Sequence, residues 1–144
     1  MKELNTTKKL DYLDKKCLVI DELAPIILQN DLEHLFREGD VNWKYVDITA
    51  EWDHDNKNVI ETPQFVHISK QEDGVYDRET FYLQCSLVYL LQDLLGCQIN
   101  GIDRIKNNCT LQHPMFENKY HPPHIDSSFP NRYTLLYYVS DSDG

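Results

Sequence analysis

The sequence lacks the features that would place it in a membrane or on a nucleic acid. No apolar run in the 144 residues approaches the about 20 residues that a membrane helix needs. The first ten residues also lack the apolar stretch of a signal peptide, so we expect a cytoplasmic protein with no membrane partner. Basic residues are scarce, because 14 Lys and Arg stand against 24 Asp and Glu and give a formal charge of −10. Such a net field repels a phosphate backbone, so no nucleic acid partner is expected.

Linkers, repeats and paired cysteine motifs are also missing. The four cysteines form no Cys-x-x-Cys pair, which argues against a zinc knuckle or a redox motif and favours free thiols. No Pro/Gly/Ser-rich stretch divides the chain. Apolar residues make up 41% of the sequence, enough for a core, and we expect residues 1–144 to form a single domain.

Hydrophobic periodicity predicts two helices. The first follows Asp21, a candidate cap, has Pro25 in its first turn and ends near Gly39. The second covers residues 77–95 and ends before Gly96.

Strand patterns occur in five segments: residues 17–20, 43–49, 64–68, 102–111 and 133–139. In the last segment Thr134, Leu136 and Tyr138 share one face, opposite Tyr133, Leu135, Tyr137 and Val139. Mixed helices and strands in this order predict an α+β fold.

The stretch before the last strand offers a pair of metal ligands. His124 and Asp126 are two residues apart, so in an extended chain their side chains point to the same side from Cα atoms about 6.5 Å apart. Imidazole plus carboxylate is part of the 2-His-1-carboxylate triad of non-haem Fe(II) oxygenases. The tripeptide alone is a weak signal, because it arises by chance in many sequences and a surface loop with a His–Asp hydrogen bond explains it more simply. The tripeptide alone leaves both interpretations open.

Several blocks around this pair carry a family resemblance. They are Val19-Ile20-Asp21, Trp43-Lys44-Tyr45, Thr62-Pro63-Gln64-Phe65-Val66-His67, Arg104-Ile105-Lys106-Asn107-Asn108, the pattern His121, His124 and Asp126, and the strand and acidic turn from Tyr133 to Gly144. In this order they resemble the Fe(II)/2-oxoglutarate-dependent oxygenases, in the prolyl-4-hydroxylase-like branch of phage and bacterial type.

The resemblance implies a fold, an activity and a set of site residues. The fold would be N-terminal helices packed on part of a double-stranded β-helix, or jelly-roll, core. The activity would be hydroxylase-type oxidation of a C–H bond in a protein or small-molecule substrate, using Fe(II), 2-oxoglutarate and O2. His124 and Asp126 would be the first two iron ligands. Tyr138 would hold the distal carboxylate of 2-oxoglutarate, and Thr134 and Leu136 share its face.

The sequence departs from the family pattern in its last part. Family members tend to have Asn where Ser140 stands, and their third iron ligand is a His far downstream, followed by an Arg or Lys that binds 2-oxoglutarate. No His follows His124 here. We therefore expect the chain to be the N-terminal portion of an oxygenase domain, catalytically incomplete by itself. A partial sheet would leave strand edges that invite self-association.

Two other functions remain open at this point. The first is a non-catalytic remnant or binding module on the same scaffold. The second is a zinc hydrolase that uses His121, His124 and Asp126, although the intervening Pro122-Pro123 favours an extended path that points the two histidines apart. We interpret His67 as a strand histidine satisfied by a hydrogen bond. Lys106 and Asn108 either line the substrate pocket or form a solvated strand face.

Overall fold

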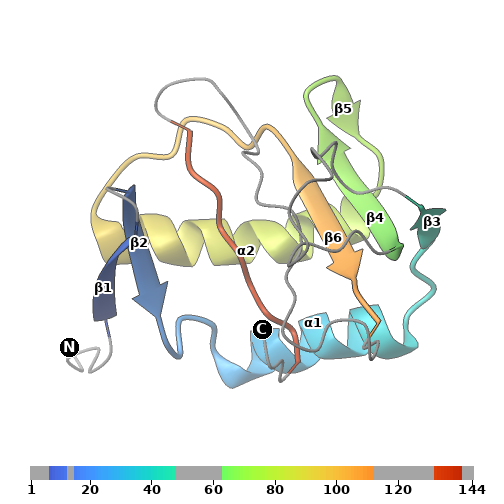
Figure 1. Ribbon diagram of the computed structural model, residues 1–144, viewed down its shortest axis with the longest axis horizontal. Coiled ribbons are helices and arrows are strands. Elements are labelled where there is room, and N and C mark those ends of the chain that lie inside the picture. Colours follow the sequence, from blue (N-terminus) through green and yellow to red (C-terminus); the bar gives the residue numbers. More distant parts are fainter. Residues whose placement is uncertain (1–6, 13–14, 48–62, 112–131, 141–144) are drawn as a thin grey trace, which may run out of the picture.

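The computed structural model describes residues 7–12, 15–47, 63–111 and 132–140. The elements in chain order are β1 (Thr7–Tyr12), β2 (Lys15–Ile20), α1 (Ile26–Glu38), β3 (Lys44–Val46), β4 (Gln64–Gln71), β5 (Gly74–Val75), α2 (Arg78–Leu95) and β6 (Ile105–Cys109) (Figure 1). The coarse α+β prediction is confirmed, since two helices accompany antiparallel strands. No helix among these residues is long and apolar enough to cross a membrane.

The strands form two antiparallel sheets. β1 and β2 pair as a hairpin, while β4 pairs with β3, β5 and β6. His67 lies opposite Asn107, and Val66 lies opposite Asn108. Cross-strand partners share a face, so these two pairs project from opposite sides of the sheet. The ladder shifts register between Ile68 and Lys70.

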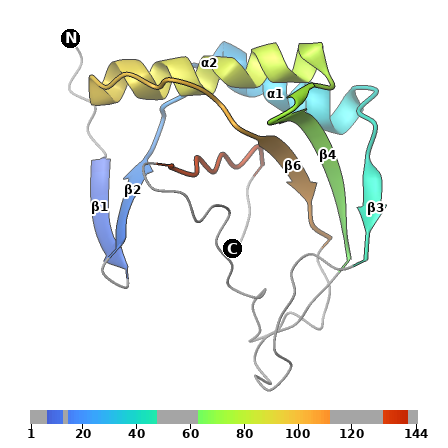
Figure 2. The same cartoon turned by 90° about the horizontal axis from the view of Figure 1, so that it is seen from above.

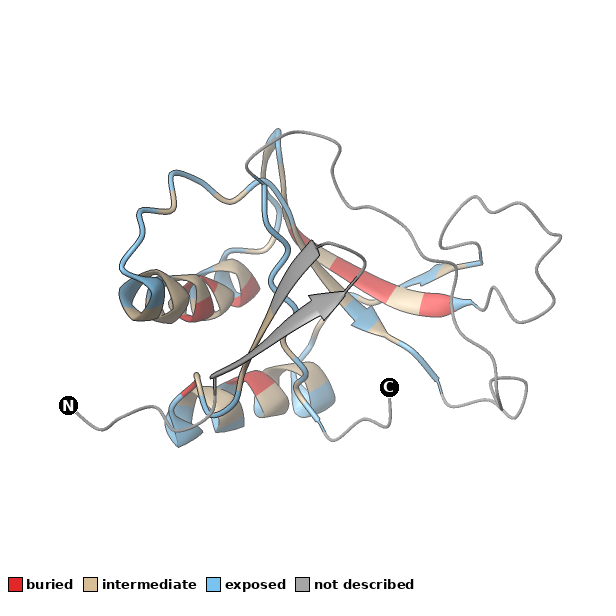
Figure 3. Cartoon of the chain, turned by 60° about the vertical axis from the view of Figure 1, so that its left-hand side comes forward, coloured by how far each residue is buried: buried red, intermediate tan, exposed pale blue. Residues whose placement is uncertain are grey.

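Both helices lie on the same side of the strands (Figure 2). Their apolar faces meet in a cluster of Ala24, Leu32 and Leu87, each 5% exposed or less. Around it pack Leu28, Phe36, Leu83 and Tyr137. Figure 3 shows buried residues on both helices and along β4. The core cluster therefore sits between the two helices, with Tyr137 packed against it.

The helix ends follow local chemistry. α2 ends as predicted at Gly96, whose φ of 59° is a left-handed conformation that glycine adopts without strain. α1 ends as predicted at Gly39, where any Cβ would overlap the carbonyl oxygen of Leu35. The prediction of Asp21 as the cap of α1 is wrong. The N-cap is Pro25, with no side-chain hydrogen bond, because the chain makes a turn at Asp21 and Glu22 before the helix begins.

The strand predictions are confirmed in part. β3 and β6 lie within predicted segments, β2 begins two residues before its segment and β4 ends three residues after its own, whereas β1 and the two-residue β5 were not predicted. The predicted strand at residues 133–139 is wrong, because residues 132–140 belong to no strand ladder. Period-two alternation predicts an extended chain with two faces, but a strand also needs a partner backbone. Cys85, Cys97 and Cys109 are free thiols, as expected.

Candidate functional site

The metal pair predicted from the sequence lies outside the described residues. His124 and Asp126, together with the alternative ligand His121, fall within residues 112–131. In the part of the chain that the structure describes, no group of three or more His, Cys, Asp and Glu side chains could hold a metal ion. The metal assignment stays a prediction. In the sequence the pair lies between β6 and residues 132–140.

Side-chain amides fix the orientation of β6. Asn107 accepts a hydrogen bond from Nε2 of Gln84 on α2, and its own Nδ2 donates to Oγ of Ser69 and to the carbonyl oxygen of His67, both at 3.3 Å. Ser69 is fully buried and donates to Oε1 of Gln84 at 3.0 Å. This network ties α2 to β4 and β6. Asn107 therefore faces the helices.

The neighbours of Asn107 point the other way. By strand alternation Lys106 and Asn108 project from the face that α2 does not cover. On this face Lys106 is half-buried and Asn108 is exposed. The choice between a pocket wall and a solvated face stays open for both residues.

In the segment of residues 132–140 the predicted alternation holds only at its end, because Tyr137 and Val139 are half-buried while Tyr133 and Leu135 are exposed like their neighbours. Tyr137 packs against the core cluster of Ala24, Leu32 and Leu87, and burial raises the pKa of its phenol above the ordinary value. Tyr138 is 67% exposed. In Figures 1 and 2 the segment runs between β2 and β6, and in Figure 2 it lies below the helices.

The three predicted co-substrate residues therefore share an environment. Thr134, Leu136 and Tyr138 are all exposed, and Leu136 is 72% exposed. Tyr137, by contrast, packs against the core cluster. All three side chains are thus accessible, as a co-substrate contact requires.

The arrangement around His67 was only partly predictable from the sequence. Its Nδ1 lies 3.2 Å from the carbonyl oxygen of Asn42, which confirms the predicted hydrogen bond. Its Nε2 lies 3.0 Å from Oδ2 of Asp77, an ion-pair distance, although no acceptor is aligned with this ring nitrogen. His67 is 6% exposed. The imidazole therefore connects β4 to the start of α2 and to the segment before β3.

Asp77 caps α2. Its Oδ1 accepts from the backbone N–H of Thr80 at 3.2 Å, and its Oδ2 accepts from the Thr80 hydroxyl at 2.6 Å. Burial raises the pKa of Asp77, but the hydrogen bonds from Thr80 and the nearby His67 outweigh it and leave the pKa below its usual value. The Asp-x-x-Thr spacing was a visible signal for the cap, but the long-range contact with His67 was not.

The side chains of His67, Asp77 and Thr80 do not form a nucleophilic triad. In such a triad the histidine lies between the acid and the hydroxyl, so that it can take the hydroxyl proton. Here the carboxylate of Asp77 lies between Thr80 and His67, and Thr80 is 1% exposed. The arrangement stabilises the junction of β4 and α2.

No protein-family model, no curated protein and no solved structure matches this chain. The family resemblance therefore rests on the ordered sequence blocks alone.

Proposed function

We propose that this chain is part of an Fe(II)- and 2-oxoglutarate-dependent dioxygenase, and that His124 and Asp126 bind the iron. The antiparallel strands with both helices on one side would form part of a double-stranded β-helix. When bound, Fe(II) supplies O2 activation coupled to decarboxylation of 2-oxoglutarate to succinate, and the prime substrate is oxidised at a C–H bond. The third iron ligand and the cationic anchor of 2-oxoglutarate would come from residues outside this chain.

One observation carries the proposal: the division of side chains along residues 132–140. Tyr137 packs against the core cluster, whereas Tyr138, Thr134 and Leu136 are exposed. The proposed role of Tyr138 requires its phenol hydroxyl to be free to donate to a carboxylate. Had Tyr138 been the buried member of the pair, this role would have been impossible.

Polar side chains on β6 also suit an anionic co-substrate. Lys106 projects from the face of β6 that α2 does not cover, and Asn108 beside it offers an amide. The donor set of His124 and Asp126 suits Fe(II), which binds imidazole and carboxylate ligands in non-haem oxygenases. The residue types therefore support both an anionic co-substrate and an Fe(II) ion.

Metal binding by single-residue variants tests the proposal. Mn(II), a redox-stable substitute for Fe(II), is titrated into the chain, and free Mn(II) is measured by electron paramagnetic resonance. We expect His124→Ala and Asp126→Ala each to weaken binding at least about tenfold, since even losing a partner of a ligand commonly costs that much. His34→Ala is the matched control, because His34 is exposed on α1, where it lies 3.2 Å from Glu38.

The same titration separates the iron and zinc assignments. The oxygenase assignment expects His121→Ala to bind Mn(II) as the unchanged chain does. A loss as large as that of His124→Ala, together with stoichiometric zinc in the gently purified chain, would support the three-ligand zinc hydrolase. Equal binding by His124→Ala and the unchanged chain would remove both assignments.

A non-catalytic binding module on the same scaffold is the second candidate. It is favoured by the segment at residues 132–140, which joins no ladder among the described strands. The reading frame past the codon of Gly144 discriminates the two functions. In-frame codons for a downstream His and Arg support the oxygenase, and a stop codon supports the module.

A further inference from the structure

An open groove of about 720 Å³ lies between the two helices, on a part of the molecule that the proposed iron chemistry does not use. Its walls are the second half of α1, the residues that follow α1 and the first turns of α2. The lining residues are Asp31, His34, Leu35, Gly39, Asp40, Val41, Asp77, Glu79, Thr80, Tyr82, Leu83 and Ser86.

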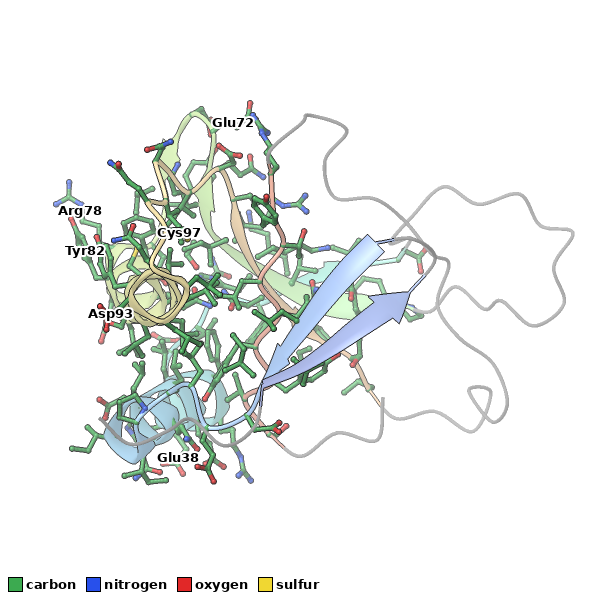
Figure 4. The ribbon with its side chains drawn as sticks, turned by 90° about the vertical axis from the view of Figure 1, so that its left-hand side faces the viewer. Glu38, Glu72, Arg78, Tyr82, Asp93 and Cys97 are labelled. Atoms are coloured by element: carbon green, nitrogen blue, oxygen red, sulfur yellow. The ribbon has the colours of Figure 1, made fainter. Side chains whose placement is uncertain are left out.

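The charge of the groove has one sign. Four carboxylates line it, those of Asp31, Asp40, Asp77 and Glu79, and no Lys or Arg is among the lining residues. Figure 4 shows the nearby Arg78 directed away from α1. The carbonyl end of α1 also opens here, and the dipole of a helix makes that end partly negative. The partly positive start of α2 opens into the same groove, where Asp77 caps it and Glu79 lies in its first turn, so the carboxylates set the charge that a cationic group would meet.

The groove also has an apolar component, which distinguishes it from a set of solvated acidic side chains. Leu35, Val41 and Leu83 are half-buried in its lining. Tyr82 adds an aromatic ring that is 66% exposed on the outer side of α2 (Figure 4). An exposed tyrosine ring can accept a lysine or arginine cation on its face. The groove thus pairs apolar contact area with carboxylates.

We propose that this groove is a docking site for a lysine- or arginine-rich segment of a partner protein that also carries apolar side chains. Its cations pair with Asp31, Asp40 and Glu79, and its apolar side chains cover Leu35, Val41 and Leu83. Asp77 contributes charge while it remains bound to Thr80 and His67. The proposal is independent of the iron pair, because none of the groove residues belongs to the predicted metal site.

A charge-matched pair of variants tests the docking site. The groove variant combines Asp31→Asn, Asp40→Asn and Glu79→Gln, and the control variant combines Asp21→Asn, Asp47→Asn and Asp73→Asn. Each removes three negative charges, and the control positions are exposed and outside the groove. Asp47 and Asp73 accept hydrogen bonds from tyrosine hydroxyls, which an asparagine oxygen can still accept.

The probe is a short fluorescein-labelled peptide of alternating lysine and leucine, and binding is measured by fluorescence anisotropy. We expect the groove variant to bind at least about tenfold more weakly than the unchanged chain, and the control variant to stay within about twofold. Tyr82→Ala, which keeps every charge, should weaken binding about threefold. A peptide with glutamate in place of lysine should not bind.

Three results would overturn the proposal. Equal losses in the groove and control variants would mean that the peptide responds only to net charge. Full binding by the groove variant would place the peptide elsewhere. Self-association of the unchanged chain that the groove variant abolishes and the control variant keeps would identify a second copy as the occupant, in place of a partner protein.

Discussion

The β4–β6 ladder and the segment of residues 132–140 both lie below the helices in the view of Figure 2. Different interactions hold the two regions in place. β4 and β6 share a register from Phe65 opposite Cys109 to Lys70 opposite Ile105, and the amide network of Asn107 ties them to α2. Residues 132–140 have no ladder partner among the described strands, and Tyr137 is their contact with the core cluster. The comparison separates two kinds of constraint: side-chain burial sets which way a segment faces, and backbone pairing holds it as a strand.

The largest loss of stability is expected from a change in the core cluster, against which both α2 and Tyr137 pack. Leu32 is fully buried in the cluster that underlies Tyr137 and α2. Leu32→Ala should lower the free energy of unfolding by about 3 kcal/mol, since it leaves a cavity that its neighbours refill only in part. Urea denaturation followed by circular dichroism measures this. Ile27→Ala, at a position on α1 that is 71% exposed, should cost little, and equal losses would contradict the placement of the core.

A more selective change weakens the ladder alone. Asn107→Ala removes the amide that joins Gln84, Ser69 and the carbonyl of His67, so buried polar groups lose their partners. We expect a loss of about 2 kcal/mol in the free energy of unfolding. Asn108→Ala is the matched control on the exposed face of the same strand and should be nearly neutral. The amide network would be refuted if the two variants had the same stability.

A change at Tyr137 weakens the attachment of residues 132–140 to the core, while Arg132 keeps its ion pairs with Glu72 and Asp103. Tyr137→Ala removes the side chain that packs on the core, and we expect a loss of about 1.5 kcal/mol because its burial is partial. Amide hydrogen exchange should speed up in residues 132–140 and stay unchanged in β4 and β6. Tyr138→Ala should alter neither quantity, since its ring is 67% exposed. A larger effect from Tyr138→Ala would reverse the assignment of the two faces.

The smallest effect concerns the junction of β4 and α2, and it depends on pH. The pKa of Asp77 is lower in the folded protein than its usual value, so its charge stabilises the fold above the unfolded pKa of about 3.9. This contribution disappears as the pH falls through the lower folded pKa. Asp77→Asn keeps a capping oxygen but loses the charge, so it should cost about 1 kcal/mol at pH 7 and almost nothing once the pH lies below the folded pKa.

Stability curves of Asp73→Asn provide the control for this pH dependence. Asp73 is exposed and accepts a hydrogen bond from Tyr76, without a helix to cap. A difference between Asp77→Asn and the unchanged chain that stays constant from pH 7 to strongly acidic pH would contradict the role given to the Asp77 charge.

Local sequence patterns predicted the helices but not the pairing of the strands or the long-range contacts. The helices at residues 26–38 and 78–95 were predictable because their apolar spacing and closing glycines are local signals. The alternation at residues 133–139 correctly separated Tyr137 from Tyr138, but it carried no information about a pairing partner. Contacts such as His67 with Asp77 and Gln84 with Asn107 depend on how the chain folds back, which no local pattern encodes.

The most direct test of the proposed iron site is paramagnetic broadening in the nuclear magnetic resonance spectrum of the isotope-labelled chain. When Mn(II) is added, we expect the signals of His124, Asp126 and residues 134–138 to broaden first, and those of Asp31 and Glu79 in the acidic groove to broaden last. His124→Ala should abolish the selective broadening. Broadening centred on the acidic groove, or broadening that His124→Ala leaves unchanged, would contradict the assignment of His124 and Asp126 as metal ligands.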